Sequence, residues 1–164
     1  MADRLVLLGP VKTFAEAGQG ALRGRAQTVR AQGLDPVIDQ IVRCNRRRGR
    51  RLMRGQLAGG LAAKTRGARP LAVAATRLSL AGSPVAGYAA ACDALAAAIE
   101  PAYERIRAPT LIVAGREDKT SPATTTAFLE RRITGAQVVW VENVGHWHVF
   151  EDVDGVAAAV RSFF

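Results

Sequence analysis

Aromatic residues are scarce in this sequence. Phe, Trp and Tyr make up 5% of its 164 residues, and much of its 49% hydrophobic content is alanine. Because alanine buries little apolar area, we expect one domain with a modest core. The longest apolar stretch of the C-terminal half, YAAACDALAAAIEP (88–101), is interrupted by Asp93 and is too short to span a bilayer. The N-terminus has no cleavage site typical of a secretory signal.

Cysteine is also rare, and cofactor motifs are weak. Cys44 and Cys92 lie in no metal or redox spacing, so we expect reduced thiols and a soluble cytoplasmic protein. GQGALRG (18–24) is close to a dinucleotide fingerprint but does not directly follow a predicted strand. His146 and His148 have a metal-like spacing but begin a predicted helix. We therefore predict no cofactor and no metal.

Acidic residues are absent from one window. Residues 43–69 contain nine arginines and one lysine, whereas the rest of the chain has 13 basic and 14 acidic residues. The net charge of +9 therefore arises in this window alone. It has three interpretations: a solvated, disordered insertion, a patch for an acidic partner or nucleic acid, or a translated retained intron or frameshift. The absence of aromatic residues for base stacking argues against nucleic acid.

The rest of the sequence alternates between predicted strands and helices. Short apolar runs predict strands at 4–10, 108–118 and 136–145, and helical patterns span 13–33, 35–42, 70–82, 83–100, 121–133 and 147–164. Asp35, Ser83 and Ser121 each precede a proline, as helix N-caps do. The strand–helix–strand–helix order of the last third predicts a parallel α/β arrangement.

Two polar residues lie at the ends of the last two predicted strands. Asp118 ends one strand, and His146 directly follows the next. Because the carboxyl ends of parallel strands meet at one sheet edge, we expect the two side chains to be neighbours. A carboxylate can hold an imidazole in one tautomer and stabilise its charged form. The pair thus predicts a general base with its orienting acid, although such residues can also be structural.

These segments resemble the C-terminal part of an α/β-hydrolase. LIVAGREDKTSP (111–122) is similar to the Gly-x-x-Asp segment that carries the family's triad acid, and VVWVENVGHWHVFE (138–151) is similar to its Gly-His segment. The matching positions are Gly115, Asp118, Gly145 and His146. LVLLGP (5–10) resembles the sixth strand, and GYAAACDALAAA (87–98) resembles the cap of 3-oxoadipate enol-lactonases and related small esterases.

The resemblance implies an α/β fold with the last three parallel strands of an α/β-hydrolase and a helical cap. Strand six would span 1–11, the cap 12–107 and the C-terminal core 108–164, with 43–69 a disordered insertion where the match fails. The implied reaction is hydrolysis of a small carboxylic ester or lactone, without a cofactor or a membrane partner. His146 would be the base and Asp118 its partner, and the implied substrate-binding residues are Leu78, Leu80, Tyr88 and Trp147.

The family's nucleophile is missing from the sequence. None of the four serines (Ser79, Ser83, Ser121 and Ser162) lies in Gly-x-Ser-x-Gly, and neither cysteine does. No oxyanion-hole segment is found either, so we expect little activity and poor solubility for the chain alone. Three hypotheses stay open: a hydrolase that lost its first half by truncation or a gene-model error, a non-catalytic protein that binds an acidic partner through 43–69, or a split enzyme completed by another chain.

Overall fold

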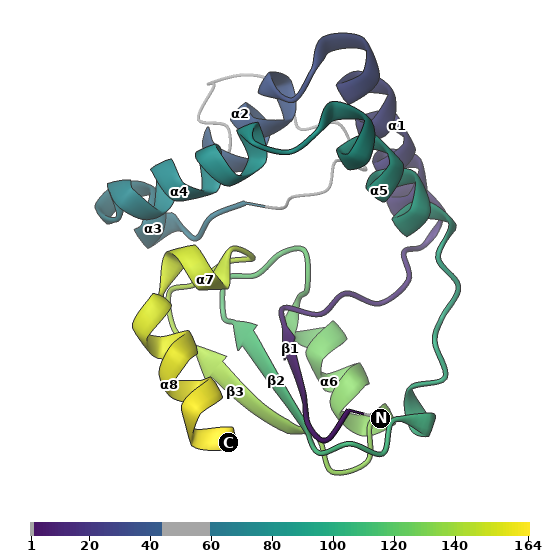
Figure 1. The fold of residues 1–164 in the computed structure, drawn as a ribbon, viewed down its shortest axis with the longest axis vertical. Helices are drawn as coiled ribbons and strands as arrows, with labels where there is room; N and C mark the ends of the chain where they lie inside the picture. Colours follow the sequence, from purple (N-terminus) through teal and green to yellow (C-terminus); the bar gives the residue numbers. More distant parts are fainter. Residues whose placement is uncertain (1, 44–59) are drawn as a thin grey trace.

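The structure, a computed structural model, describes residues 2–43 and 60–164 (Figure 1). Its centre is a three-stranded parallel sheet in the order β1-β2-β3. The strands are β1 (Leu5–Leu8), β2 (Thr110–Gly115) and β3 (Gln137–Val141). Leu7 pairs with Ile112, which pairs on its other side with Val138. The predicted parallel α/β fold is therefore confirmed.

Helices cover both faces of the sheet. Helix α6 (Ala123–Arg132) lies on one face and α8 (Val153–Phe163) on the other (Figure 1). Successive β2 side chains point to opposite faces, so Ile112 packs with Leu129 of α6, while Val113 packs with Val156 of α8. Every residue of β2 is buried as a result. The central strand is thus covered on both of its faces.

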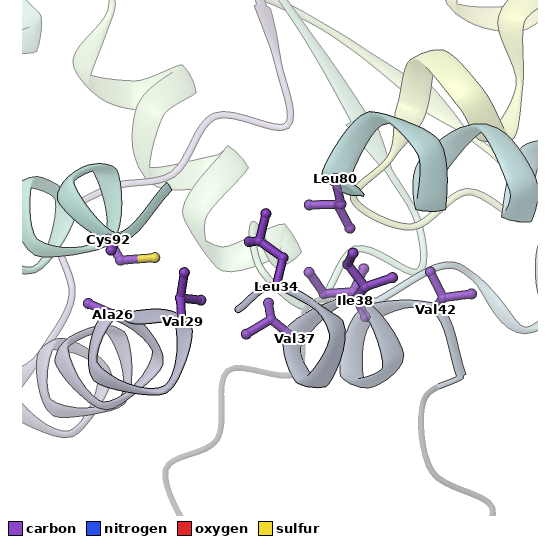
Figure 2. Close-up of a cluster of buried hydrophobic side chains, with 10 residues drawn as sticks. Ala26, Val29, Leu34, Val37, Ile38, Val42, Leu80 and Cys92 are labelled. Carbon is purple, nitrogen blue, oxygen red and sulfur yellow. The ribbon is translucent and has the colours of Figure 1, made fainter. Parts of the chain in front are cut away.

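A helical cap lies beyond the carboxyl ends of the strands (Figure 1). It consists of α1 (Glu16–Gln32), α2 (Asp35–Arg43), α3 (Ala63–Ala68), α4 (Pro70–Ala81) and α5 (Val85–Ala97). Figure 2 shows the cap's own apolar cluster, in which Val29 of α1, Ile38 of α2 and Leu80 of α4 are buried. The cap therefore has a core separate from those on the sheet faces.

The 3-10 turn η1 (Tyr103–Arg105) leads from the cap into β2, and the short helix α7 (His148–Glu151) lies between β3 and α8. Asp152 separates α7 from α8, because its side chain accepts a hydrogen bond from the Gly155 amide and caps α8. The terminal helix predicted for 147–164 is consequently two helices. None of the described helices combines the length and the apolar character needed to cross a membrane.

Three local predictions differ from the structure. Ser83 and Ser121 do not cap helices: the N-cap positions are Pro84 and Pro122, and each serine hydroxyl donates to a backbone carbonyl instead. Asp35 is the first residue within α2. Residues 60–69, predicted as part of the disordered insertion, include helix α3, and the amides of Ala62 and Ala63 donate to Glu151 and Glu117. Residues 44–59, which hold most of the arginine window, lie outside the described residues.

Candidate active site

The three strands deliver three residues to one place at the sheet edge. Gly9 follows β1, Asp118 follows β2, and His146 follows β3. Asp118 Oδ2 and His146 Nδ1 are 2.9 Å apart. A methyl group on Gly9, where φ is +52°, would lie 3.1 Å from the same carboxylate oxygen. The predicted acid and base therefore meet, and the backbone that leaves β1 passes directly beside them.

Asp118 is fixed at both of its oxygens. Oδ1 accepts hydrogen bonds of 2.8 Å from the backbone amides of Thr120 and Ser121. Oδ2 faces His146, and no part of the side chain is exposed to solvent. Because all these partners are donors, the carboxylate acts as an acceptor throughout. Its orientation is thus set by the backbone of its own loop, independently of the histidine.

His146 has one nitrogen committed and one available. Nδ1–H donates to Asp118, which leaves the lone pair on Nε2. Nε2 makes no hydrogen bond to the described residues, and 30% of the side chain is exposed. A neutral imidazole in this tautomer can take a proton at Nε2, and the buried carboxylate then stabilises the imidazolium. The pair has the geometry of a general base with its orienting acid.

Two glycines let the loops that carry Asp118 and His146 come together. A Cβ on Gly115 would lie 2.4 Å from the Val144 carbonyl oxygen and 2.5 Å from that of Gly145. A Cβ on Gly145 would lie 2.6 Å from the Gly60 carbonyl oxygen. These are backbone atoms, which cannot rotate away as a side chain would. The glycines that precede the acid and the base are therefore required by close backbone packing.

Glu151 is a functional candidate that the sequence did not reveal. This side chain, in α7, is 3% exposed, and its two oxygens accept four hydrogen bonds. Two come from the amides of Gly145 and Trp147, on either side of the base, and two from Ala62 and Thr65 in the cap. The sequence offers no sign of this role, because three of the donors are backbone groups.

His148 is a second, buried histidine beside the acid. Its Nε2 accepts a 2.9 Å hydrogen bond from the Gly115 amide, and its Nδ1 donates to the His146 carbonyl. This arrangement requires a neutral ring. Burial lowers the pKa of His148 below its ordinary value of 6.5, although the nearby Asp118 acts in the opposite direction. His148 is consequently not available as a second base.

The lowered pKa of His148 predicts acid sensitivity. The unfolded chain binds a proton near pH 6.5 that the folded chain resists, so this residue's contribution to stability is complete above pH 6.5 and is lost as the pH falls below it. We expect the free energy of unfolding to fall by at most about 1.4 kcal/mol per pH unit from this source. Urea denaturation between pH 5 and 8 measures it. A His148→Asn variant with an equally steep decline would contradict the assignment.

The predicted substrate-binding residues occupy different environments. Leu80 is 4% exposed within the cap core, whereas Leu78 is 71% exposed on the same helix. Tyr88 and Trp147 are both partly buried and pack against the cap cluster. Trp147 therefore links the cap to the loop between β3 and α7 that carries His146, which we call the base loop (142–147). Burial raises the pKa of Tyr88. The assignment of these four residues to substrate binding stays a prediction.

Three of the chain's four serines have hydroxyls bonded to backbone carbonyls. The hydroxyls of Ser83, Ser121 and Ser162 donate to the carbonyls of Ser79, Pro10 and Ala159. Ser79 is exposed on α4. Among the described residues, no serine hydroxyl hydrogen-bonds to His146, and no group of three or more His, Cys, Asp or Glu residues is arranged to hold a metal ion. In the described part of the chain, the Asp118–His146 pair (the dyad) therefore has no serine hydrogen-bonded to His146 Nε2.

Comparison with known proteins connects this geometry to a family. A family model described as the alpha/beta hydrolase family matches residues 1–159. An esterase from Thermogutta terrifontis superposes with a TM-score of 0.81 at 21% identity, over 98% of this chain and 55% of that one. The enol-lactonase from Burkholderia xenovorans LB400 superposes at 0.76 and 21%, with the same two coverages. MenH from S. aureus gives 0.76 at 16%, over 98% of this chain and 58% of that one.

The chain thus spans little more than half the length of these three structures. A search of curated proteins found no match. The three parallel strands, with the acid and base after the last two, correspond to a C-terminal portion of the hydrolase fold. Because the family model covers almost every residue, this chain belongs to the alpha/beta hydrolase family.

Proposed function

We propose that this chain supplies the acid and base of an active site that hydrolyses a small carboxylic ester or lactone. The observation that carries the proposal is the 2.9 Å contact between Asp118 and His146, with Nε2 of the histidine left available. The enol-lactonase and esterase among the structural neighbours support ester and lactone substrates, and an enol-lactone is the lactone we favour. Tyr88 and Trp147, where the cap meets the base loop, are the proposed substrate contacts.

In this proposal His146 transfers the proton in each chemical step. Its Nε2 first removes the proton from a nucleophilic hydroxyl as that oxygen attacks the substrate carbonyl, and it then returns the proton to the leaving alcohol or enol oxygen. Asp118 keeps the proton on Nδ1 and stabilises the imidazolium between the two steps. The same Nε2 would then deprotonate a water molecule that attacks the acyl carbonyl, and it would return that proton to the nucleophile's oxygen as the bond to the acyl group breaks. The buried carboxylate gives the transient positive charge a fixed partner.

The nucleophile in this scheme comes from polypeptide outside the 164 residues. The four serines of the chain lie in no Gly-x-Ser-x-Gly segment, and the hydroxyls of three of them donate to backbone carbonyls. A segment that carries the nucleophile and the oxyanion donors would lie along β1, which is an edge strand of the described sheet. The proposal therefore concerns a composite site, of which this chain forms the proton-transfer half.

Complementation tests this function. The chain would be co-expressed with the unmatched N-terminal portion of the Thermogutta terrifontis esterase, and hydrolysis of p-nitrophenyl acetate and an enol-lactone would be followed on the purified complex. We expect background rates for the chain alone and serine-dependent turnover for the complex. His146→Ala should lower that turnover by about a thousandfold or more, because it removes the base.

Two controls make the result interpretable. Glu142→Gln changes an exposed carboxylate four residues before His146 and should leave the turnover unchanged. Substitution of the complement's serine should abolish it. Turnover that is insensitive to His146→Ala in a purified complex would overturn the proposal, as would a complex that binds substrate and has the dyad formed but does not hydrolyse it.

A further inference from the structure

The carboxylate of Glu151 joins the catalytic loop to the cap. Oε1 accepts from the amides of Gly145 at 3.1 Å and Trp147 at 3.0 Å, the residues on either side of His146. Oε2 accepts from the Ala62 amide and the Thr65 hydroxyl, both at 2.8 Å. All four partners donate, so both oxygens act as acceptors. One buried side chain thus binds both the loop that carries His146 and a segment of the cap.

The cap segment that it holds, residues 60–65, is called the strap here. The strap also contacts the loop between β2 and α6 that carries Asp118, which we call the acid loop (116–122). In this contact Glu117 Oε2 accepts a 2.9 Å hydrogen bond from the Ala63 amide. It lies against the base loop so closely that a Cβ on Gly145 would be 2.8 Å from the Ala62 nitrogen. Arg69, just beyond α3, donates to the Glu151 carbonyl. The strap is therefore docked on both catalytic loops at once.

We propose that Glu151 is a positioning residue that makes the alignment of His146 with Asp118 depend on the docking of the strap. The ring of His146 is held at Nδ1, and its backbone is held through the two flanking residues, each of which donates its amide to Glu151. Glu151 is itself oriented by two strap donors. Loss of the strap contacts would let the carboxylate turn and release the base loop.

This proposal deepens the proposed function, since it assigns a control of the same base, but its test does not use hydrolysis. The readout is the solvent-exchange rate of the His146 Nδ1 proton in the 164-residue chain, measured by NMR together with the exchange of the Gly145 and Trp147 amides. The Val113 amide, in the buried central strand, reports global opening. A failure to find hydrolysis would therefore leave this measurement intact.

Two variants act from opposite ends of the connection. Glu151→Gln replaces one acceptor oxygen with a donor group, which opposes two of the four partners. Thr65→Val removes only the strap hydroxyl, far along the sequence from His146, and Thr65→Ser restores it. We expect Nδ1 exchange to rise about tenfold in Thr65→Val and further in Glu151→Gln, which corresponds to one or more lost hydrogen bonds. Thr65→Ser and the exposed-site control Glu142→Gln should match the unmodified chain.

Thr65→Val tests the coupling between the strap and His146 even if Glu151→Gln does not fold. Faster exchange at His146 Nδ1 without faster exchange at Val113 supports coupling through Glu151. Faster exchange confined to the Ala62 and Ala63 amides would overturn it and leave Glu151 a local structural residue. Equal acceleration at His146 and Val113 would also overturn it, because the effect would then be global unfolding.

Discussion

Replacement of Asp118 by asparagine is expected to lower the turnover of the complemented hydrolase by about four orders of magnitude while the fold is retained. The reason is that the surroundings of Asp118 determine which of its two carboxylate oxygens is replaced by the amide nitrogen. Oδ1 accepts from two backbone amides, Thr120 and Ser121, so the carbonyl oxygen of the new side chain must stay at that position. The NH2 group then occupies the position of Oδ2 and faces His146 Nδ1 as a donor.

Two donors cannot share that contact, so His146 has to move its proton from Nδ1 to Nε2. The nitrogen that should accept a proton then carries one, and the base is lost although every heavy atom is nearly in place. The imidazole nitrogen shifts in a long-range ¹H–¹⁵N NMR spectrum distinguish the two tautomers directly. The chain has only two histidines, which makes the assignment simple.

Asp154→Asn provides the matched control for this change. Asp154 is exposed in the first turn of α8, so the same chemical substitution there should alter neither the tautomer nor the turnover. If the Asp118→Asn chain kept its proton on Nδ1, the orientation that we derive for the amide would be wrong. If the tautomer changed and turnover did not, His146 would not be the base.

Replacement of Gly115 by alanine is expected to destabilise the fold by about 3 kcal/mol. The added methyl group would lie within 2.5 Å of two carbonyl oxygens of the base loop, and the register between β2 and β3 would have to shift to make room. The same shift would separate His146 from Asp118 and weaken the hydrogen bond from the Gly115 amide to His148. Urea denaturation followed by circular dichroism gives the stability change.

Gly20→Ala is the appropriate comparison. Gly20 lies within α1, and a Cβ there would meet nothing within 4 Å. Alanine in a helix loses less backbone entropy on folding than glycine, so this variant should be more stable by about 0.5–1 kcal/mol. A loss of stability in Gly115→Ala together with a gain in Gly20→Ala would identify the contact of the added methyl group with the backbone as the cause of the loss. A Gly115→Ala chain as stable as the original would contradict the close packing of the loops.

The position of the dyad could be predicted from sequence because it depends on short-range patterns. Apolar runs predicted the three strands, and parallel strands place their carboxyl ends together, so Asp118 and His146 had to be neighbours. The resemblance of the Gly-x-x-Asp and Gly-His segments to a hydrolase added the order of the strands. Both inferences needed only residues next to each other in the chain and one rule about sheet topology.

The supporting contacts could not be predicted in this way. Glu151 binds amides from residues 62, 145 and 147, which lie in two distant segments, and a backbone donor leaves no trace in the sequence. His148 had a metal-like spacing with His146, but its two nitrogens are used by Gly115 and the His146 carbonyl. Ser83 and Ser121 had the pattern of helix caps and instead bond to nearby or distant carbonyls. Tertiary contacts decided each case.

The acid and the base also differ in how firmly their strands are held. Asp118 follows β2, which is paired on both sides and fully buried, whereas His146 follows β3, which in the described sheet pairs only with β2 and has an exposed first residue. Native-state fluctuations open the least protected elements first. The dyad should therefore separate by excursions of β3 and the base loop while the acid stays in place, and hydrogen exchange should protect the amides of β2 longer than those of β3. The lifetime of the contact between Asp118 and His146, rather than the lifetime of the whole fold, would then limit how long the site can transfer a proton.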